Sequence, residues 1–211
     1  MIIKQLKYFI VEDVRSARRF LKKVSKEINI DDLTFSILNE QTPLTEIPSL
    51  IAPLLQGNNV GILSEAGCPA VADPGAAVVQ LAHKKKIRVV PLVGPSSILL
   101  SLMASGFNGQ QFAFAGYLPV KQNDRVNALK HLEKKVYTEN QTQIFIETPY
   151  RNEKLMEELI RTCSPQTYLC IAADITLPTE FIRTMPLAAW KNNLPDLNKR
   201  PAIFLLGTTT F

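Results

Sequence analysis

The segment from residue 60 to residue 92 constrains the fold of this chain more than any other. It contains two apolar stretches with a helical stretch between them. Residues 60–64 (VGILS) have the pattern of a buried strand, residues 76–85 have helical character, and residues 87–92 form the next apolar strand. A strand, a helix and a strand at this spacing form a βαβ unit, which implies a parallel sheet with a right-handed crossover. The sequence therefore predicts an α/β fold.

The same pattern continues on both sides of this unit. Residues 7–11 are a short β-rich run, and apolar positions then repeat at helical spacing as far as Val24. After a helix predicted at 98–105, the segment 106–111 (GFNGQQ) is the best candidate linker. Beyond it we predict strands at 112–115, 143–147, 168–173, 180–184 and 202–206, and helices at 125–137, 152–163 and 186–190.

We therefore predict two α/β domains, residues 1–108 and 109–211. The first has a mostly parallel sheet with helices on both faces, and the second has a mixed sheet.

Composition narrows the class of protein further. A net charge of +5 is compatible with a polyanionic partner, but it says nothing about the fold. Three cysteines without CxxC spacing and only two histidines are too few for a zinc site or a disulfide framework, so we expect no metal and a reducing cytoplasm.

A long uncharged stretch, residues 89–120, raises the question of a membrane span. Pro91, Gly94 and Pro95 interrupt it, and the longest purely apolar piece, residues 98–104, is far shorter than the ~20 residues that a spanning helix needs. The first residues also lack the apolar core of a secretory signal. We expect a cytoplasmic protein with no membrane segment.

Three loops that follow predicted strands combine glycine or proline with polar side chains. They are residues 65–75, 93–97 and 147–151. Ligands of open α/β sheets bind outside the carboxyl ends of the strands, so a ligand cleft is expected there. The chain has no GxGxxG, no P-loop and no GxSxG motif, and His83 and His131 are expected on helix surfaces, which leaves no base for a serine nucleophile.

These loops resemble those of a known family. Residues 64–69 (SEAGCP) with 73–75 (DPG) resemble the signature loop of the tetrapyrrole-methylase superfamily, and residues 91–97 (PLVGPSS) resemble its second signature. Residues 12–15 (EDVR) with Arg18, and residues 147–151 (ETPYR), resemble motifs of its branch of small-subunit rRNA methyltransferases. The resemblance extends over essentially the whole chain.

The resemblance implies two α/β domains, S-adenosylmethionine (SAM) bound in the cleft between them without a metal, and a homodimer. The cofactor pocket would be lined by Asp73, Ala76, Ser96 and Ser97 from the first two loops, and by Thr148 and Ala173 from the second domain.

Methyl transfer to a ribose hydroxyl is an in-line displacement that benefits from a carboxylate able to accept the hydroxyl proton. Glu12, Asp13 and Glu65 are the candidates, although Glu12 and Asp13 equally suit the electrostatics of a helix N-terminus. If the substrate is RNA, Arg15, Arg18 and Arg151 would bind phosphate or ribose. The whole basic run of segment 15–23, with Arg15 and Arg18 included, is expected to be a solvated helix face, with RNA contact as the alternative.

The sequence also departs from this branch. Relatives begin with an additional strand and a proline-containing loop, so we expect the family's first strand to be lacking here, either because the start codon is placed late, which we favour, or because the form is truncated. Residues 173–177 (ADITL) lack two basic positions of the branch.

Three functions follow. The leading one is SAM-dependent 2′-O-methylation of a cytidine in small-subunit rRNA, with the rRNA or ribosomal subunit as partner. The alternatives are methylation of a small molecule such as a tetrapyrrole, and a non-catalytic binding protein with this fold.

Overall fold

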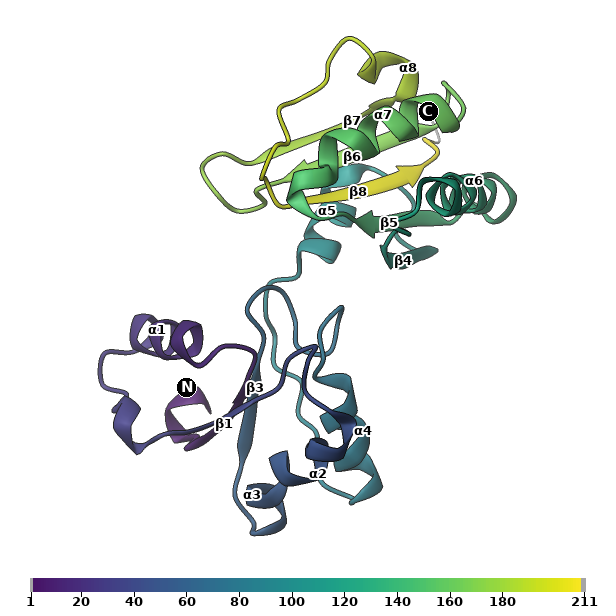
Figure 1. Ribbon diagram of the computed structural model, residues 1–211. Coiled ribbons are helices and arrows are strands. Elements are labelled where there is room, and N and C mark those ends of the chain that lie inside the picture. The colour runs from purple at the N-terminus through teal and green to yellow at the C-terminus, as the bar shows by residue number, and fades with distance from the viewer. Residues whose placement is uncertain (1, 210–211) are drawn as a thin grey trace. The chain divides into compact units, whose positions relative to one another are not determined.

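The computed structural model describes residues 2–209, which form two compact units that meet in the sequence at Pro95 and Ser96 (Figure 1). Both units are α/β, as the sequence predicts.

The first unit contains a parallel sheet of three strands in the order β2-β1-β3. The strands are β1 (Tyr8–Val11), β2 (Thr34–Ile37) and β3 (Val60–Leu63). The helices are α1 (Val14–Val24), α2 (Ile47–Leu50), α3 (Ala52–Leu55) and α4 (Ala76–Lys84), with short 3-10 helices η1 (Ile2–Gln5), η2 (Ile30–Asp32) and η3 (Leu44–Glu46).

Alternation along β1 divides this unit into two apolar layers. Phe9 and Val11 pack with Ala17 and Leu21 of α1, whereas Ile10 packs on the other face with residues of α2 and α4. Figure 1 shows α1 on one side of β1 and β3 and α4 on the other. The prediction of a parallel sheet with helices on both faces is confirmed.

The predicted strand at residues 87–92 is wrong. Residues 88–96 belong to no helix or strand, and Val90 and Leu92 are 54% and 60% exposed. A strand requires a neighbour that supplies backbone partners, and β3, at the edge of the sheet, pairs only with β1 within residues 2–209. Apolar residues alone therefore do not make this segment a strand.

The second unit contains a mixed sheet of five strands in the order β4-β5-β8-β6-β7. Only the β4–β5 pair is parallel. The strands are β4 (Phe112–Tyr117), β5 (Thr142–Ile146), β6 (Tyr168–Ala173), β7 (Phe181–Pro186) and β8 (Ala202–Gly207). The helices are α5 (Ser97–Ser105), α6 (Gln122–Glu139), α7 (Asn152–Thr162) and α8 (Leu187–Trp190), with the 3-10 helix η4 (Pro149–Arg151).

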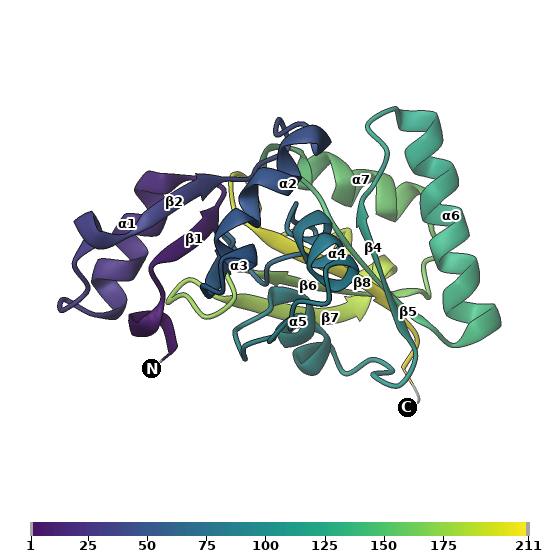
Figure 2. The same ribbon diagram turned by 90° about the horizontal axis from the view of Figure 1, so that it is seen from below.

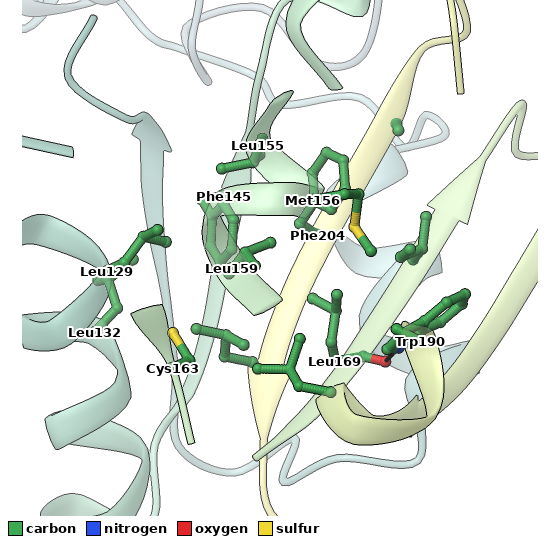
Figure 3. Close-up of a cluster of buried hydrophobic side chains, with 14 of the residues drawn as sticks. Leu129, Leu132, Phe145, Leu155, Met156, Leu159, Cys163, Leu169, Trp190 and Phe204 are labelled. Carbon is green, nitrogen blue, oxygen red and sulfur yellow. Dashed lines mark hydrogen bonds between the residues drawn. The ribbon is translucent and has the colours of Figure 1, made fainter. Parts of the chain in front are cut away.

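The main core of the second unit lies between this sheet and helices α6, α7 and α8. Leu159 of α7, Leu169 of β6 and Phe204 of β8 are fully buried in it, and the aromatic rings of Phe145 and Phe204 stack (Figure 3). The buried Trp190 donates its indole N–H to the carbonyl of Leu169 at 3.1 Å. Figure 2 shows α6 running beside β4 and β5.

Helix α5 covers the opposite face of the second sheet. Its Leu102 packs with Cys170 of β6 and Leu205 of β8. The chain accordingly divides before this helix, at Pro95 and Ser96, whereas the sequence placed the boundary at residues 108 and 109. The glycine-rich segment 106–111 suggested a linker, but burial of the apolar side of α5 against the second sheet is what assigns the helix to that unit.

Candidate functional site

A carboxylate and a backbone amide meet where strands β1 and β3 end. The two strands are parallel neighbours, with Val11 opposite Leu63, so the residues that follow them emerge at the same edge of the sheet. There the Glu12 side chain accepts a hydrogen bond from the backbone N–H of Glu65 at 2.9 Å. The residues after β1 and the start of the predicted ligand loop 65–75 therefore meet at one edge of the first sheet, while the convergence of all three predicted loops stays a prediction.

Asp73 shapes the loop between β3 and α4. Its Oδ1 accepts hydrogen bonds from the amides of Ala70 at 3.2 Å and Gly75 at 3.1 Å. Ala70 and Ala72 adopt positive φ values of 68° and 55°, which are uncommon for residues with a side chain and persist only when the surroundings impose them. The loop is thus held in one conformation up to Ala76, the exposed first residue of α4.

The electrostatics of this edge single out Glu12. Burial raises the pKa of its carboxyl above the ordinary 4.5, and a hydrogen bond to Asp73 and the negative charges of Asp73 and Glu65 raise the pKa further. The Glu65 amide acts in the opposite direction, because it donates to the ionised form. A carboxylate with a raised pKa is a better proton acceptor than an ordinary surface glutamate.

Asp13 has a different environment from its neighbour. It is the N-cap of α1, where its Oδ1 accepts the amide of Ser16 at 2.6 Å, and this hydrogen bond lowers its pKa. Of the two interpretations open for residues 12 and 13, helix-end electrostatics accounts for Asp13, whereas Glu12 points to the loop after β3.

The second loop is joined to the first. The thiol of Cys68 donates to the carbonyl of Pro95 at 3.6 Å, which links the two family-like loops within the first unit. Ser96 then occupies the N-cap position of α5, but its side chain makes no capping hydrogen bond, and Ser97 is exposed. Both hydroxyl groups remain available to a ligand.

The loop after β5 is organised around a buried carboxylate. Oε1 of Glu147 accepts hydrogen bonds from the amide of Thr148 at 2.7 Å and from Arg151 Nε and Nη2 at 3.0 and 2.6 Å. Arg151 Nε also contacts the Thr148 hydroxyl at 3.0 Å. Sequence reasoning assigned Arg151 to the substrate and missed Glu147, although their i,i+4 spacing was visible. Much of the donor capacity of Arg151 serves this loop.

The end of β6 offers a ligand little. Ala173 is fully buried, and its strand is paired on both sides, with Phe181 of β7 and Ala202 of β8. The next residue, Asp174, accepts hydrogen bonds from Arg200 Nε at 2.8 Å and the Thr179 hydroxyl at 2.9 Å. The sequence did not predict this second carboxylate that fixes a loop, because Arg200 lies on a distant segment.

The two predicted arginines of α1 are exposed. The Arg18 guanidinium lies over the ring of Phe35, 5.6 Å from its centroid. Arg15 and Arg18, together with Asp13, Val14 and Arg19, line a hollow of about 470 Å³.

Another hollow, of about 660 Å³, lies in the second unit. It is lined by Gln110, Gln111, Phe112, Glu139 and Gln141, next to the amino ends of β4 and β5. Ligands of α/β sheets bind at the opposite, carboxyl edge, so this hollow does not displace the site above.

Within residues 2–209, no cluster of three or more histidine, cysteine or acidic side chains is arranged to hold a metal ion. In the same part of the chain, every helix is too short or too polar to cross a bilayer.

Comparison with known proteins assigns the family. Residues 2–190 match the family described as Tetrapyrrole (Corrin/Porphyrin) Methylases. The chain is a member of the tetrapyrrole methylase family. The resemblance stated from the sequence motifs is thereby confirmed.

Among curated members of this family, the chain is similar to "Ribosomal RNA small subunit methyltransferase I" of Escherichia coli O157:H7, with 32% identity over 172 residues, 80% of this chain and 58% of that protein. The protein of the same name from Vibrio cholerae is 29% identical over 187 residues, 89% of this chain and 62% of its own length. The chain thus spans about three fifths of the length of these relatives.

A solved structure confirms the tetrapyrrole methylase fold. The crystal structure of the methyltransferase CobJ superposes with a TM-score of 0.60 and 15% identity, covering 95% of this chain and 94% of that one. At this identity the likeness concerns the fold alone.

Proposed function

We propose that this tetrapyrrole methylase is a SAM-dependent methyltransferase that methylates the ribose 2′-hydroxyl of a cytidine in small-subunit rRNA. The family and the names of the relatives support this activity. The observation that carries the proposal is the position of Glu12, a carboxylate with a raised pKa at the carboxyl edge of a parallel sheet, beside Asp73 and Glu65.

The residues present fit the proposed cofactor. SAM supplies an activated methyl group on a positively charged sulfur. The acidic side chains Glu65 and Asp73 suit a cation, and the hydroxyl groups of Ser96, Ser97 and Thr148 suit the polar ends of a nucleoside and an amino acid. The position of SAM between the two units stays a prediction, and so does a role for Ala76 and Ala173 in its pocket.

In the proposed mechanism, Glu12 accepts the proton of the ribose hydroxyl, and that oxygen would receive the methyl group that bound SAM would supply. Glu65 is the second candidate, since its amide already orients Glu12. Asp13 serves α1 as its cap. Arg15 and Arg18 bind phosphate or ribose, and Arg151 positions the loop that carries Thr148.

Glu12→Gln tests this role. Loss of a positioned base typically lowers the rate by 10²–10⁴-fold, so we expect at least about a hundredfold loss of methyl transfer to small ribosomal subunits, with SAM binding retained in calorimetry. Glu40→Gln, an exposed glutamate of the same unit, is the matched control. Full activity of Glu12→Gln would remove Glu12 from the mechanism.

The second candidate function is methylation of a small molecule such as a tetrapyrrole. The family match favours it. RNA binding would weaken steeply as salt is raised, because phosphate contacts release counterions, whereas a tetrapyrrole would bind almost independently of salt. The third candidate, a non-catalytic binding protein, requires that SAM fails to bind.

We also propose that the protein works in the cytoplasm as a homodimer, with the small-subunit rRNA as its partner. The homodimer and the rRNA partner derive from the resemblance, and the cytoplasm derives from the cysteine usage of the chain. Analytical ultracentrifugation tests the oligomeric state, and a monomer at micromolar concentration would contradict it.

A further inference from the structure

Helix α1 carries an uninterrupted stripe of positive charge. Five basic residues are exposed along it, and at 3.6 residues per turn they occupy an arc of about 140°. The helix contains no acidic residue, and within residues 2–209 none of the five is in an ion pair. We call this set the basic stripe: Arg15, Arg18, Arg19, Lys22 and Lys23.

The basic stripe opposes the stability of its own helix. Residues 15 and 19, 18 and 22, and 19 and 23 are like charges four apart, which repel one another. Arg15 also lies in the first turn, where the helix dipole disfavours a cation. A face that served only solvation would gain from mixed signs, so this arrangement points to an anionic partner.

An exposed aromatic residue adjoins the basic stripe. Phe20 follows Arg19 and lies three residues before Lys23, and it is 49% exposed. The apolar side of α1 is otherwise buried, since Ala17 and Leu21 pack against the sheet. A single aromatic ring among cations suits the stacking of an unpaired base better than insertion into a lipid surface, which requires a broad apolar face.

We propose that the basic stripe with Phe20 is a docking surface for single-stranded RNA, in which Arg15, Arg19, Lys22 and Lys23 contact successive phosphates and Phe20 stacks on a base. Arg18, which lies over Phe35, lines the same hollow as Arg15 and Arg19. This inference rests on the proposed function and extends it, because it adds Arg19, Phe20, Lys22 and Lys23 to the RNA contacts proposed for the family-like motif.

Two variants separate the two kinds of contact. Arg19→Glu removes one phosphate contact, and the carboxylate that it introduces repels the neighbouring phosphates. RNA affinity at about 0.1 M salt should therefore fall about fivefold or more, and the slope of log affinity against log salt should decrease in magnitude by about 0.7. Phe20→Leu should also lower the affinity about fivefold, but with an unchanged salt slope, because stacking releases no counterions.

The melting temperature of Arg19→Glu distinguishes a lost RNA contact from misfolding as the cause of weaker binding. The carboxylate that Arg19→Glu introduces would lie four residues from Arg15 and from Lys23, which replaces two repulsive pairs with two attractive ones. We therefore expect the melting temperature of Arg19→Glu to be unchanged or higher by about 2 °C while RNA binding falls. A lower melting temperature together with weaker binding would mean a structural role and would overturn the proposal.

Binding is measured by fluorescence anisotropy with a short labelled single-stranded RNA between about 50 and 200 mM salt. Lys84→Glu, at an exposed position of α4, is the control for net charge and should match wild type. An equal loss in Lys84→Glu, or binding by wild type to anionic vesicles but not to RNA, would overturn the docking surface.

Methyl transfer to small ribosomal subunits is measured in parallel. If wild type and Arg19→Glu methylate rRNA equally at about 200 mM salt, the docking surface is refuted while the proposed function stands. If wild type binds RNA with the expected slope but transfers no methyl group to rRNA, the docking surface stands and the proposed function fails.

Discussion

Replacing Arg151 with methionine tests how the loop after β5 is held. The Glu147 side chain is 1% exposed and that of Arg151 is 33% exposed. Arg151→Met leaves the buried carboxylate with the Thr148 amide as its remaining donor. Loss of one partner of a buried pair costs about 3–5 kcal/mol, but water reaches the arginine side of this pair, so we expect about 2 kcal/mol.

The reciprocal change should cost less. In Glu147→Gln, the partly exposed guanidinium can be hydrated, and the amide oxygen of glutamine can still accept from the Thr148 amide. We expect about 1 kcal/mol, the range of an ordinary hydrogen bond. The buried partner, Glu147, is therefore the one that depends on the pair.

Urea unfolding followed by tryptophan fluorescence measures both changes. Trp190 is the only tryptophan of the chain and is buried in the second unit, so its emission reports on the unit that contains this loop. Lys130→Met, at an exposed position of α6, should change the free energy of unfolding by less than about 0.5 kcal/mol. Equal costs for Arg151→Met and Glu147→Gln, or a larger cost for Glu147→Gln, would refute the reasoning.

Three further predictions concern the first unit and the cysteines. Because the pKa of Glu12 is raised, the rate of methyl transfer should decline on the acid side at a pH above the ordinary 4.5, and Asp73→Asn should move that decline to lower pH. A pH–rate profile checks both expectations, and an unmoved profile in Asp73→Asn would contradict the influence of Asp73 on Glu12. Asp13→Ala should speed hydrogen exchange of the Ser16 amide, whereas Asp13→Asn keeps the cap, and equal exchange in both variants would argue against the cap. In the wild type, protection of this amide should persist at neutral pH and be lost only as the pH falls through the lowered pKa of Asp13. Burial raises the pKa of Cys163 to about 12 and of Cys170 to about 11, so both thiols stay protonated at mildly alkaline pH. Iodoacetamide should therefore modify Cys68 first, as measured by peptide mass spectrometry, and comparable labelling of Cys170 in the folded protein would be inconsistent with its burial.

The sequence predicted most elements because their apolar patterns are local. The strand at 168–173 was placed at its observed bounds, and the helix at 152–163 within one residue. The expected exposure of His83 and His131 is confirmed for the same reason. The four-residue strand β2 was missed, because two of its positions, Thr34 and Ser36, are polar.

Failures arose where a distant partner decides the outcome. Residues 87–92 have the composition of a strand, yet pairing depends on a neighbour that composition does not reveal. Within the site, the motif placed Glu12 correctly at the sheet edge. The different roles of Glu12 and Asp13 could not be predicted, because they depend on which of the two side chains accepts from the Ser16 amide. Likewise, the charge of Arg151 suggested RNA, whereas the burial of Glu147 is a tertiary property.

The open side of β3 has a consequence for handling the protein. Its four residues, Val60–Leu63, carry no charge, proline or bulge that would deter another chain from adding to them, and segment 88–93 of the same unit exposes further valines. Natural proteins protect the edge strands of their sheets, because unpaired backbone amides and carbonyls can pair with a strand of another molecule. Concentrated solutions should therefore self-associate through the first unit.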